Sequence, residues 1–414
     1  MKLHIVGGFL GSGKTTAINN AAGLLASKGE KVGVITNDPC DDTQDNTIVH
    51  ANYSPSEVVI NSSFSSNLDN LSDKVVSLHQ DAQPNYIFAE SVGSCTDLVA
   101  TVLKPLMIFY DHIFESLTLS IIVDARMLLS YLKGEKQLFG DEVIYIFRKQ
   151  IEEADLLVIN KIDLLADEDF PVLNKLVNKF LIDKPIITQN SFNPQNIVNW
   201  LDTLESLSQR KRTSLEIDYQ SYGKGEKDLT WLDEEIIFNA LNNEAVEYAV
   251  RFIDNMLMDI YEKQLPIGHL TFRLADGEKA QEISFTAFDD KDWKKSIHPI
   301  ASNKIKLIMN ARLETTYETL NAIVNNNIAT LTNQGVNVTK STKGLVSPGI
   351  PKLIHHSSSP FRCCEECICL KKLLARNEIR KAEGSEKAMA ELEDENFECL
   401  GLCGECGEGD GCCC

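Results

Sequence analysis

The sequence lacks both a membrane-length apolar run and an excess of basic charge. A membrane helix needs about 18 or more consecutive apolar residues, and the 414-residue sequence contains no such run. Lys and Arg number 40 against 60 Asp and Glu, which gives a formal net charge of −20. Because nucleic-acid binding needs clustered basic side chains, we expect neither a nucleic-acid partner nor a membrane partner.

Cysteine is nearly absent before residue 363. Of the 12 cysteines, only Cys40 and Cys95 precede Cys363. The opening "MKLHIVGGFLGSGKTT" holds too short an apolar stretch for a secretion signal, so we expect a cytoplasmic protein without a disulfide framework. Clustered thiols in a reducing compartment indicate metal or redox chemistry.

Residues 1–205 alternate short apolar runs with helical periods. The predicted strands are "KLHIVG", "KVGVITN", "NYIFAE", "LSIIVDA", "DLLVINKID" and "PIIT". Strands that alternate with helices in this way are typical of a mostly parallel, doubly wound α/β sheet.

The rest of the chain changes character several times. Residues 206–234 are polar and contain Gly, which predicts a linker. Residues 235–332 predict a smaller α+β domain with two helices and three strands. We expect an irregular connector over 333–361, which is rich in Gly, Ser, Thr, Asn and Pro, and a Cys-rich tail over 362–414.

The segment "GGFLGSGKTT" fits the phosphate-loop pattern G-x-x-x-x-G-K-S/T, and it lies between a predicted strand and a predicted helix. Glycines let the backbone wrap round phosphate, and the free N–H groups of the helix face the anion. Lys14 is expected to reach the β- and γ-phosphates, and the Thr15 hydroxyl to bind Mg²⁺. The predicted nucleotide-binding residues here are Gly8, Gly11, Ser12, Gly13, Lys14, Thr15 and Thr16.

The segment "NKID" follows the apolar run "DLLVI" and favours guanine as the base. Asp163 can accept hydrogen bonds from N1–H and the exocyclic amine of guanine, and adenine lacks that pair of donors. Asn160 would brace the loop, and Lys161 would pack along the base. The alternative is an ordinary polar strand end.

The segment "YIFAESVG" supplies further candidates at the end of a strand. Glu90 can hold a water bound to Mg²⁺, and Gly93 can offer its N–H to the γ-phosphate. Asp38 in "TNDPCDD" is a weaker catalytic candidate, for Mg²⁺ or for the attacking water. An ordinary acidic strand end remains the alternative for Glu90.

Together these motifs resemble the CobW family of metal-handling GTPases, of the SIMIBI class. The segments that carry the resemblance are "GGFLGSGKTT", "VGVITND", "AESVGSCTDLVATVLKPL", "NKID", "IGHLTFRL" and "MNARLE". Relatives of that family include nickel-insertion GTPases and nitrile-hydratase activators. The resemblance implies GTP-dependent handling of zinc, cobalt or a similar metal, including roles in cobalamin biosynthesis.

The sequence departs from that family at its metal motif. The resemblance implies Cys-x-Cys-Cys where this chain reads "INSSFSSNL", with Ser63, Ser65 and Ser66 in place of thiols. A neutral hydroxyl is a poor ligand for thiophilic metals. The metal site beside the nucleotide is therefore expected to be lost or rebuilt, and serine here could instead cap the helix expected near Asn67.

Two groups of thiols could replace that motif. Cys40 and Cys95 could form half of a tetrahedral site, although two unrelated thiols are the favoured reading. The tail contains C-x-x-C, C-x-C and C-x-x-x-C-x-x-C spacings, which suit zinc or another thiophilic ion and leave an iron–sulfur cluster open. The tail cysteines are Cys363, Cys364, Cys367, Cys369, Cys399, Cys403, Cys406, Cys412, Cys413 and Cys414.

These observations predict a GTP-hydrolysing metallochaperone that delivers metal to a client metalloprotein or cofactor pathway. Lys14, Glu90 and Asp38 are its expected catalytic residues, and GTP and magnesium its expected ligands. A GTP-gated metal or redox sensor, or a GTPase with a purely structural zinc tail, remains open. The sequence names neither metal nor client, and a homodimer is only an expectation by analogy.

Overall fold

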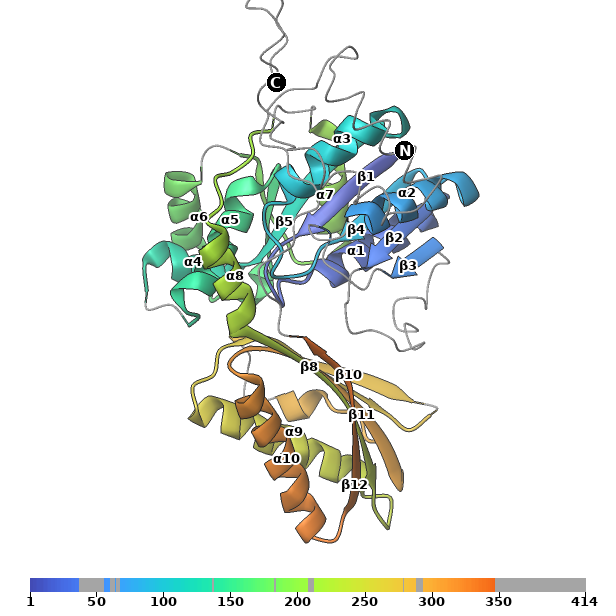
Figure 1. The fold of residues 1–414 in the computed structure, drawn as a ribbon, viewed down its shortest axis with the longest axis vertical. Coiled ribbons are helices and arrows are strands. Elements are labelled where there is room, and N and C mark those ends of the chain that lie inside the picture. Colours follow the sequence, from blue (N-terminus) through green and yellow to red (C-terminus); the bar gives the residue numbers. More distant parts are fainter. Residues whose placement is uncertain are drawn as a thin grey trace, which may run out of the picture.

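The computed structural model consists of two domains, each built round one sheet and connected through a helix (Figure 1). The helix is α8 (Tyr219–Asp228), which runs directly into the first strand of the second domain. The described residues are 1–36, 56–59, 64, 68–135, 138–181, 184–207, 212–277, 279–287 and 293–346.

Within the described residues, the first domain holds a seven-stranded parallel sheet in the order β3-β2-β4-β1-β5-β6-β7. Its strands are β1 (Lys2–Gly7), β2 (Val32–Thr36), β3 (Ser56–Val59), β4 (Tyr86–Glu90), β5 (Ser116–Asp124), β6 (Leu156–Asn160) and β7 (Ile186–Thr188). The six predicted strands are present, and β3 is an addition at the edge. Continuous apolar runs suit strands that helices cover on both faces.

Helices cover both faces of this sheet, which confirms the doubly wound α/β class. On one face α1 and α7 pack over β-strand residues such as Val34 and Ile122, and on the other face lie α2 to α6. The helices are α1 (Lys14–Ser27), α2 (Leu68–Asp81), α3 (Lys104–Tyr110), α4 (Ala125–Lys133), α5 (Asp141–Glu153), α6 (Asp169–Phe180) and α7 (Pro194–Ser206). The α4 boundaries have local causes, because the Asp124 carboxylate caps its start and Gly134 ends it in a left-handed conformation.

The described part of the second domain is a five-stranded antiparallel sheet in the order β10-β9-β11-β8-β12. Its elements are β8 (Leu229–Asn239), α9 (Ala245–Glu262), β9 (Ile267–Ala275), β10 (Ala280–Phe285), β11 (Lys304–Glu314), α10 (Tyr317–Asn333) and β12 (Asn337–Val346). Helices α9 and α10 pack on one face of this sheet (Figure 1). The side chains of β9 alternate between that core and the opposite, open face.

Two segments differ from the sequence expectation. The predicted linker 206–234 contains α8 and the start of β8, and the predicted connector contains β12. Strand β12 is rich in Thr, Lys and Ser, so its apolar signal is weak, and pairing with β8 stabilises it as an edge strand. No helix in the described ranges is long and apolar enough to cross a membrane.

Candidate nucleotide site between the two domains

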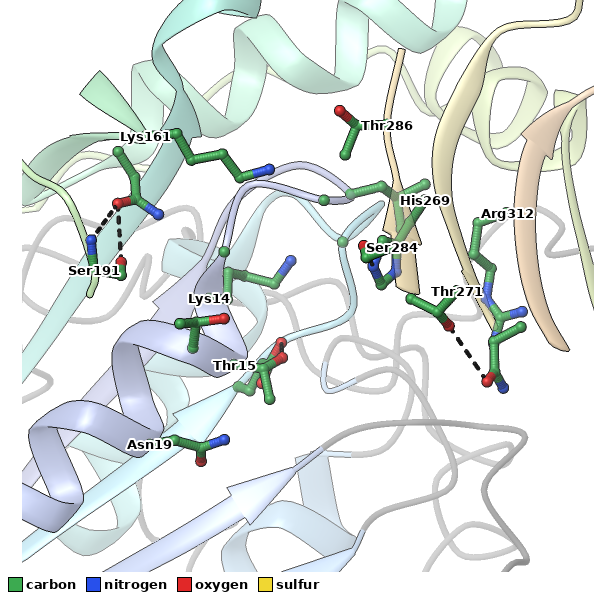
Figure 2. Close-up of a pocket in the computed structure, with 18 of the residues that line it drawn as sticks. Lys14, Thr15, Asn19, Lys161, Ser191, His269, Thr271, Ser284, Thr286 and Arg312 are labelled. Carbon is green, nitrogen blue, oxygen red and sulfur yellow. Dashed lines mark hydrogen bonds between the residues drawn. The ribbon is translucent and has the colours of Figure 1, made fainter. Parts of the chain in front are cut away.

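A cavity of about 690 Å³ lies where the carboxyl ends of parallel strands meet the open face of the second sheet. Its lining includes phosphate-loop residues, strand-end residues of β4 and β6, and side chains of β8 to β11 (Figure 2). Of the predicted site residues it takes in Gly11, Gly13, Lys14, Thr15, Thr16, Glu90, Gly93, Asn160, Lys161 and Asp163. Cavities of this size accommodate small-molecule ligands.

The phosphate loop turns tightly between β1 and α1. Gly8 has φ of 129°, and a Cβ there would lie 2.0 Å from the carbonyl oxygen of Ile122. Only glycine fits such a position. Gly13 precedes the first residue of α1, so the free N–H groups of that helix point toward the cavity.

Lys14 is held against the backbone of the same loop. Its Nζ donates to the carbonyl oxygens of Gly8 at 2.9 Å and Phe9 at 3.3 Å. Burial lowers the pKa of Lys14, and the Glu90 carboxylate opposes that shift. An ammonium group at this place offers positive charge to a bound phosphate.

The two predicted magnesium residues converge. The Thr15 hydroxyl donates to Glu90 Oε1 at 2.9 Å, which brings the start of α1 next to the end of β4. A hydroxyl and a carboxylate oxygen are ligands that Mg²⁺ accepts, commonly with water and substrate phosphate completing its shell. The donor set therefore fits magnesium.

The "NKID" segment joins the phosphate loop to a loop after β7. Asn160 Nδ2 donates to Ser12 O at 2.9 Å, and Asn160 Oδ1 accepts from Ser191 N at 3.1 Å and Ser191 Oγ at 2.9 Å. Lys161 takes a left-handed conformation, and its Nζ lies 3.4 Å from Asp124 Oδ2. Asp163 follows in a short 3-10 turn (Ile162–Leu164) at the pocket.

The sequence reasoning missed two parts of the lining. One is the loop Asn190, Ser191 and Phe192, where Asn20 Nδ2 of α1 also donates to Ser191 O at 2.8 Å. This loop could have been predicted to lie at the site, because it follows β7, the last predicted strand of the parallel sheet. The other part is the open face of the second sheet, which nothing in the linear sequence places beside the phosphate loop.

Behind Gly93, the segment from Ser91 to Ala100 is wholly buried under α5. The carboxyl group of Glu153 accepts hydrogen bonds from Thr96 Oγ1 at 3.2 Å and Val99 N at 3.3 Å. Burial, with a contribution from the nearby Asp97, raises the pKa of Glu153 to about 8. Glu153 is therefore a protonated acid through neutral pH.

Helix α8 is attached to this buried segment. The Tyr222 hydroxyl accepts from Thr96 N at 3.3 Å, and the Tyr219 hydroxyl donates to Asp97 Oδ2. Gly225 packs so closely on α5 that a Cβ would lie 2.5 Å from Glu142 O. The loop after Glu90 thus contacts the helix that continues into the second domain.

Several predicted residues fall outside the described ranges: Asp38, Cys40, Ser63, Ser65, Ser66, Asn67 and all ten cysteines of the tail. Cys95 is described and is 1% exposed within the core of the first domain. Among the described residues, no group of three or more His, Cys, Asp or Glu side chains is arranged to hold a metal ion.

A phosphate loop, an acidic strand end and an "NKID" loop around one cavity define a P-loop nucleotide-binding domain. Residues 2–188 match the family described as the CobW/HypB/UreG nucleotide-binding domain. The first domain of this chain belongs to that family, as its motifs had indicated.

Solved structures to which this chain is similar include a HypB protein and a YjiA GTPase. HypB from Helicobacter pylori, in complex with nickel, is 15% identical, with 51% of this chain and 91% of that chain covered and a TM-score of 0.34. The Zn(II)-bound YjiA GTPase from E. coli is 13% identical, with 78% and 97% covered and a TM-score of 0.31.

Proposed function

We propose that this chain binds GTP with Mg²⁺ in the cavity between its domains and hydrolyses it to GDP and phosphate. The observation that carries the proposal is the hydrogen bond between Thr15 and Glu90. It brings a phosphate-loop hydroxyl and a strand-end carboxylate to one point, in the same cavity as Lys14 and Asp163. This combination fits a triphosphate with its metal better than it fits either ligand alone.

Each end of the cavity has a distinct proposed role. Lys14 and the N–H groups at the start of α1 neutralise the phosphates, and bound Mg²⁺ would withdraw charge from the bridging oxygens. Thr15 and Glu90 hold that ion, and Gly93 offers its N–H to the γ-phosphate. At the other end Asp163 accepts the two guanine donors, which supports GTP over ATP.

Loss of the γ-phosphate would release Gly93 and hence the buried segment behind it. The contacts of Thr96 and Asp97 with Tyr222 and Tyr219 provide a path from that segment to α8. Because α8 continues into β8 without a break, a shift of the loop would reach the second domain.

The metal-handling part of the proposal rests on the sequence of the tail and on the family of the first domain. Thiolates at C-x-x-C and C-x-x-x-C-x-x-C spacings would bind zinc, cobalt or a similar ion as cargo. The nucleotide state of the first domain would then decide when the cargo passes to a client metalloprotein.

The enzyme proposal is tested by phosphate release from the full chain with GTP and Mg²⁺, with and without Zn²⁺. Lys14→Ala is the inactive comparison, and Lys28→Ala, just beyond the end of α1, is the matched control. Hydrolysis that is equal in wild type and Lys14→Ala under both conditions would refute the GTPase assignment.

Metal delivery needs a separate measurement. The full chain and a chain without residues 362–414 are loaded with Zn²⁺, and transfer to a chromogenic chelator is followed with GTP or GDP present. The proposal predicts nucleotide-dependent transfer that disappears with the tail. Metal that stays bound whatever the nucleotide would instead favour a structural zinc tail, and release without onward transfer to an acceptor protein would favour a sensor.

A further inference from the structure

The open face of the antiparallel sheet forms the wall of the cavity opposite the phosphate loop. Helices α9 and α10 cover the other face, so side chains on the open face are available to a ligand. On β9, Leu270 and Phe272 point into the core, whereas His269 and Thr271 alternate to the open face and line the cavity. This wall is polar, as expected where the ligand is polar.

The two domains are in close contact beside this wall. A Cβ on Gly11 would lie 2.6 Å from Thr286 Cγ2 and 2.9 Å from Gly268 O. The side chain of Leu10 is wedged between Gly93 and Gly268, since a Cβ on either glycine would lie less than 3 Å from a Leu10 methyl carbon, at 2.6 and 2.8 Å. The loop expected to meet the γ-phosphate therefore reaches β9 through one side chain.

His269, the residue after Gly268, projects into the cavity on the side facing Lys14 (Figure 2). Its Nε2 lies 3.2 Å from Ser284 Oγ, and its Nδ1 makes no hydrogen bond with any residue that the structure describes. In the tautomer whose Nε2 accepts the Ser284 hydroxyl, Nδ1 carries the proton and can donate to a ligand.

The neighbours of His269 favour this neutral donor. Burial, and then the positive charges of Arg312, Lys14 and Lys161, lowers its pKa to about 3. Arg312 lies opposite His269 in the sheet register and is fixed by Asp233, with Nη1 2.6 Å from Asp233 Oδ1. A neutral imidazole is the form that can both accept from Ser284 and donate into the cavity.

From this geometry we infer that His269 of the second domain donates a hydrogen bond to the terminal phosphate of the bound guanosine triphosphate. The inference rests on the proposed function and extends it, because it makes the antiparallel sheet part of the triphosphate site. GDP lacks the group that His269 would contact. The second domain would therefore distinguish the two nucleotides directly, in addition to the path through α8.

The experiment measures the dissociation constants of GDP and of a GTP analogue with an imido β–γ bridge, by calorimetry with Mg²⁺. The full-length wild type is compared with His269→Ala, His269→Asn and Ser284→Ala. Asparagine keeps an N–H near the position of Nδ1. His298→Ala is the matched control, since His298 lies in the same domain, is exposed and bonds to Gln281 only through its backbone.

We expect His269→Ala to raise the dissociation constant of the analogue about ten-fold or more, as for loss of a hydrogen bond to a charged group. The dissociation constant of GDP should change less than about two-fold. Ser284→Ala should have a smaller effect of the same kind, and His269→Asn should recover part of the loss. The control should match wild type.

Two results would overturn the inference while GTP binding by the wild type remains intact. One is an unchanged affinity of His269→Ala for the analogue. The other is an equal loss of affinity for the analogue and for GDP, which would mean that His269 only maintains the shape of the cavity. If the wild type binds neither nucleotide, the proposed function itself is refuted, and this inference with it.

Discussion

The two sheets contribute to the cavity in different ways. The parallel sheet contributes residues at the ends of its strands: the phosphate loop follows β1, and Glu90 and Asn160 are the last residues of β4 and β6. The antiparallel sheet contributes side chains from the middle of its open face, such as His269 and Asn310. Parallel topology collects loops at one edge, whereas antiparallel topology with helices on one face leaves a whole face available.

This difference suggests a division of roles that mutation can test. The strand ends of the parallel sheet would carry the chemistry and base selection, and the antiparallel sheet would respond to the nucleotide. Changes at the strand ends should therefore have the largest effects on turnover. Changes at the junction between the sheets should mainly affect stability and domain docking.

The largest effect is expected at the magnesium end. Glu90→Gln keeps the shape of the side chain and can still accept from Thr15, but it removes the carboxylate charge. We expect GTP turnover to fall about 100- to 1,000-fold, on the scale of losing one electrostatic group in an active site. Steady-state phosphate release measures this, with the exposed Glu168→Gln as control, and turnover close to wild type would exclude Glu90 from the chemistry.

Base selection should depend on Asp163. Asp163→Ala removes both acceptors for the guanine donors, and we expect about 100-fold weaker GTP binding, as for two hydrogen bonds to a charged group. ATP binding should change little, so the preference for GTP should shrink. Competition titrations with both nucleotides measure it, and Asp167→Ala, an exposed aspartate of the same segment, is the control. An undiminished preference would place the base elsewhere.

The buried acid behind Gly93 should make stability depend on pH. Burial raises the pKa of Glu153 from 4.5 to about 8, so between these values the unfolded chain ionises while the folded chain stays protonated. The contribution of this group to folding stability is fully present below pH 4.5, and it is lost progressively as the pH rises towards 8. The free energy of unfolding of Glu153→Gln should therefore rise by about 3.5 kcal/mol relative to that of wild type between pH 5 and pH 8. Denaturant unfolding at both pH values measures the gain, and a difference that is independent of pH would contradict the assigned protonation.

The smallest effect is expected where the sheets touch. Gly11 and Gly29 both have positive φ, of 68° and 87°, but a Cβ on Gly29 would meet nothing within 4 Å. Alanine at either site should lower the free energy of unfolding by about 1 kcal/mol, because a residue with a Cβ is disfavoured at positive φ. Without nucleotide, Gly11→Ala should lower the free energy of unfolding by about 1 kcal/mol more than Gly29→Ala does, because its Cβ meets β9 and Thr286. Thermal unfolding of both variants measures this, and equal losses would argue against the close contact between the domains.

The sequence predicted the parallel sheet well because its strands are short apolar runs that end in recognisable motifs. Thr15, Glu90 and Asn160 could be placed together because parallel strands share one edge. The antiparallel sheet was predicted less completely. Strand β8 begins inside a stretch that contains polar and charged residues, and β12 has few apolar residues, so only pairing in the folded chain defines them.

The role of the open face could not be predicted for a different reason. His269 looks in sequence like one alternating residue of an ordinary strand, and its partners Ser284 and Arg312 lie on other strands. Their position opposite the phosphate loop depends on how the two domains dock, and Leu10 packs at that junction between Gly93 and Gly268. Local patterns carry no information about such docking.

The central claim is that the cavity between the domains is a guanine nucleotide site. Calorimetric titration of the full chain with GTP and ATP, each with Mg²⁺, tests it most directly. The account predicts one GTP per chain, with ATP about 100-fold weaker because it cannot pair with Asp163. Equal or tighter binding of ATP, or no binding of either nucleotide, would contradict it.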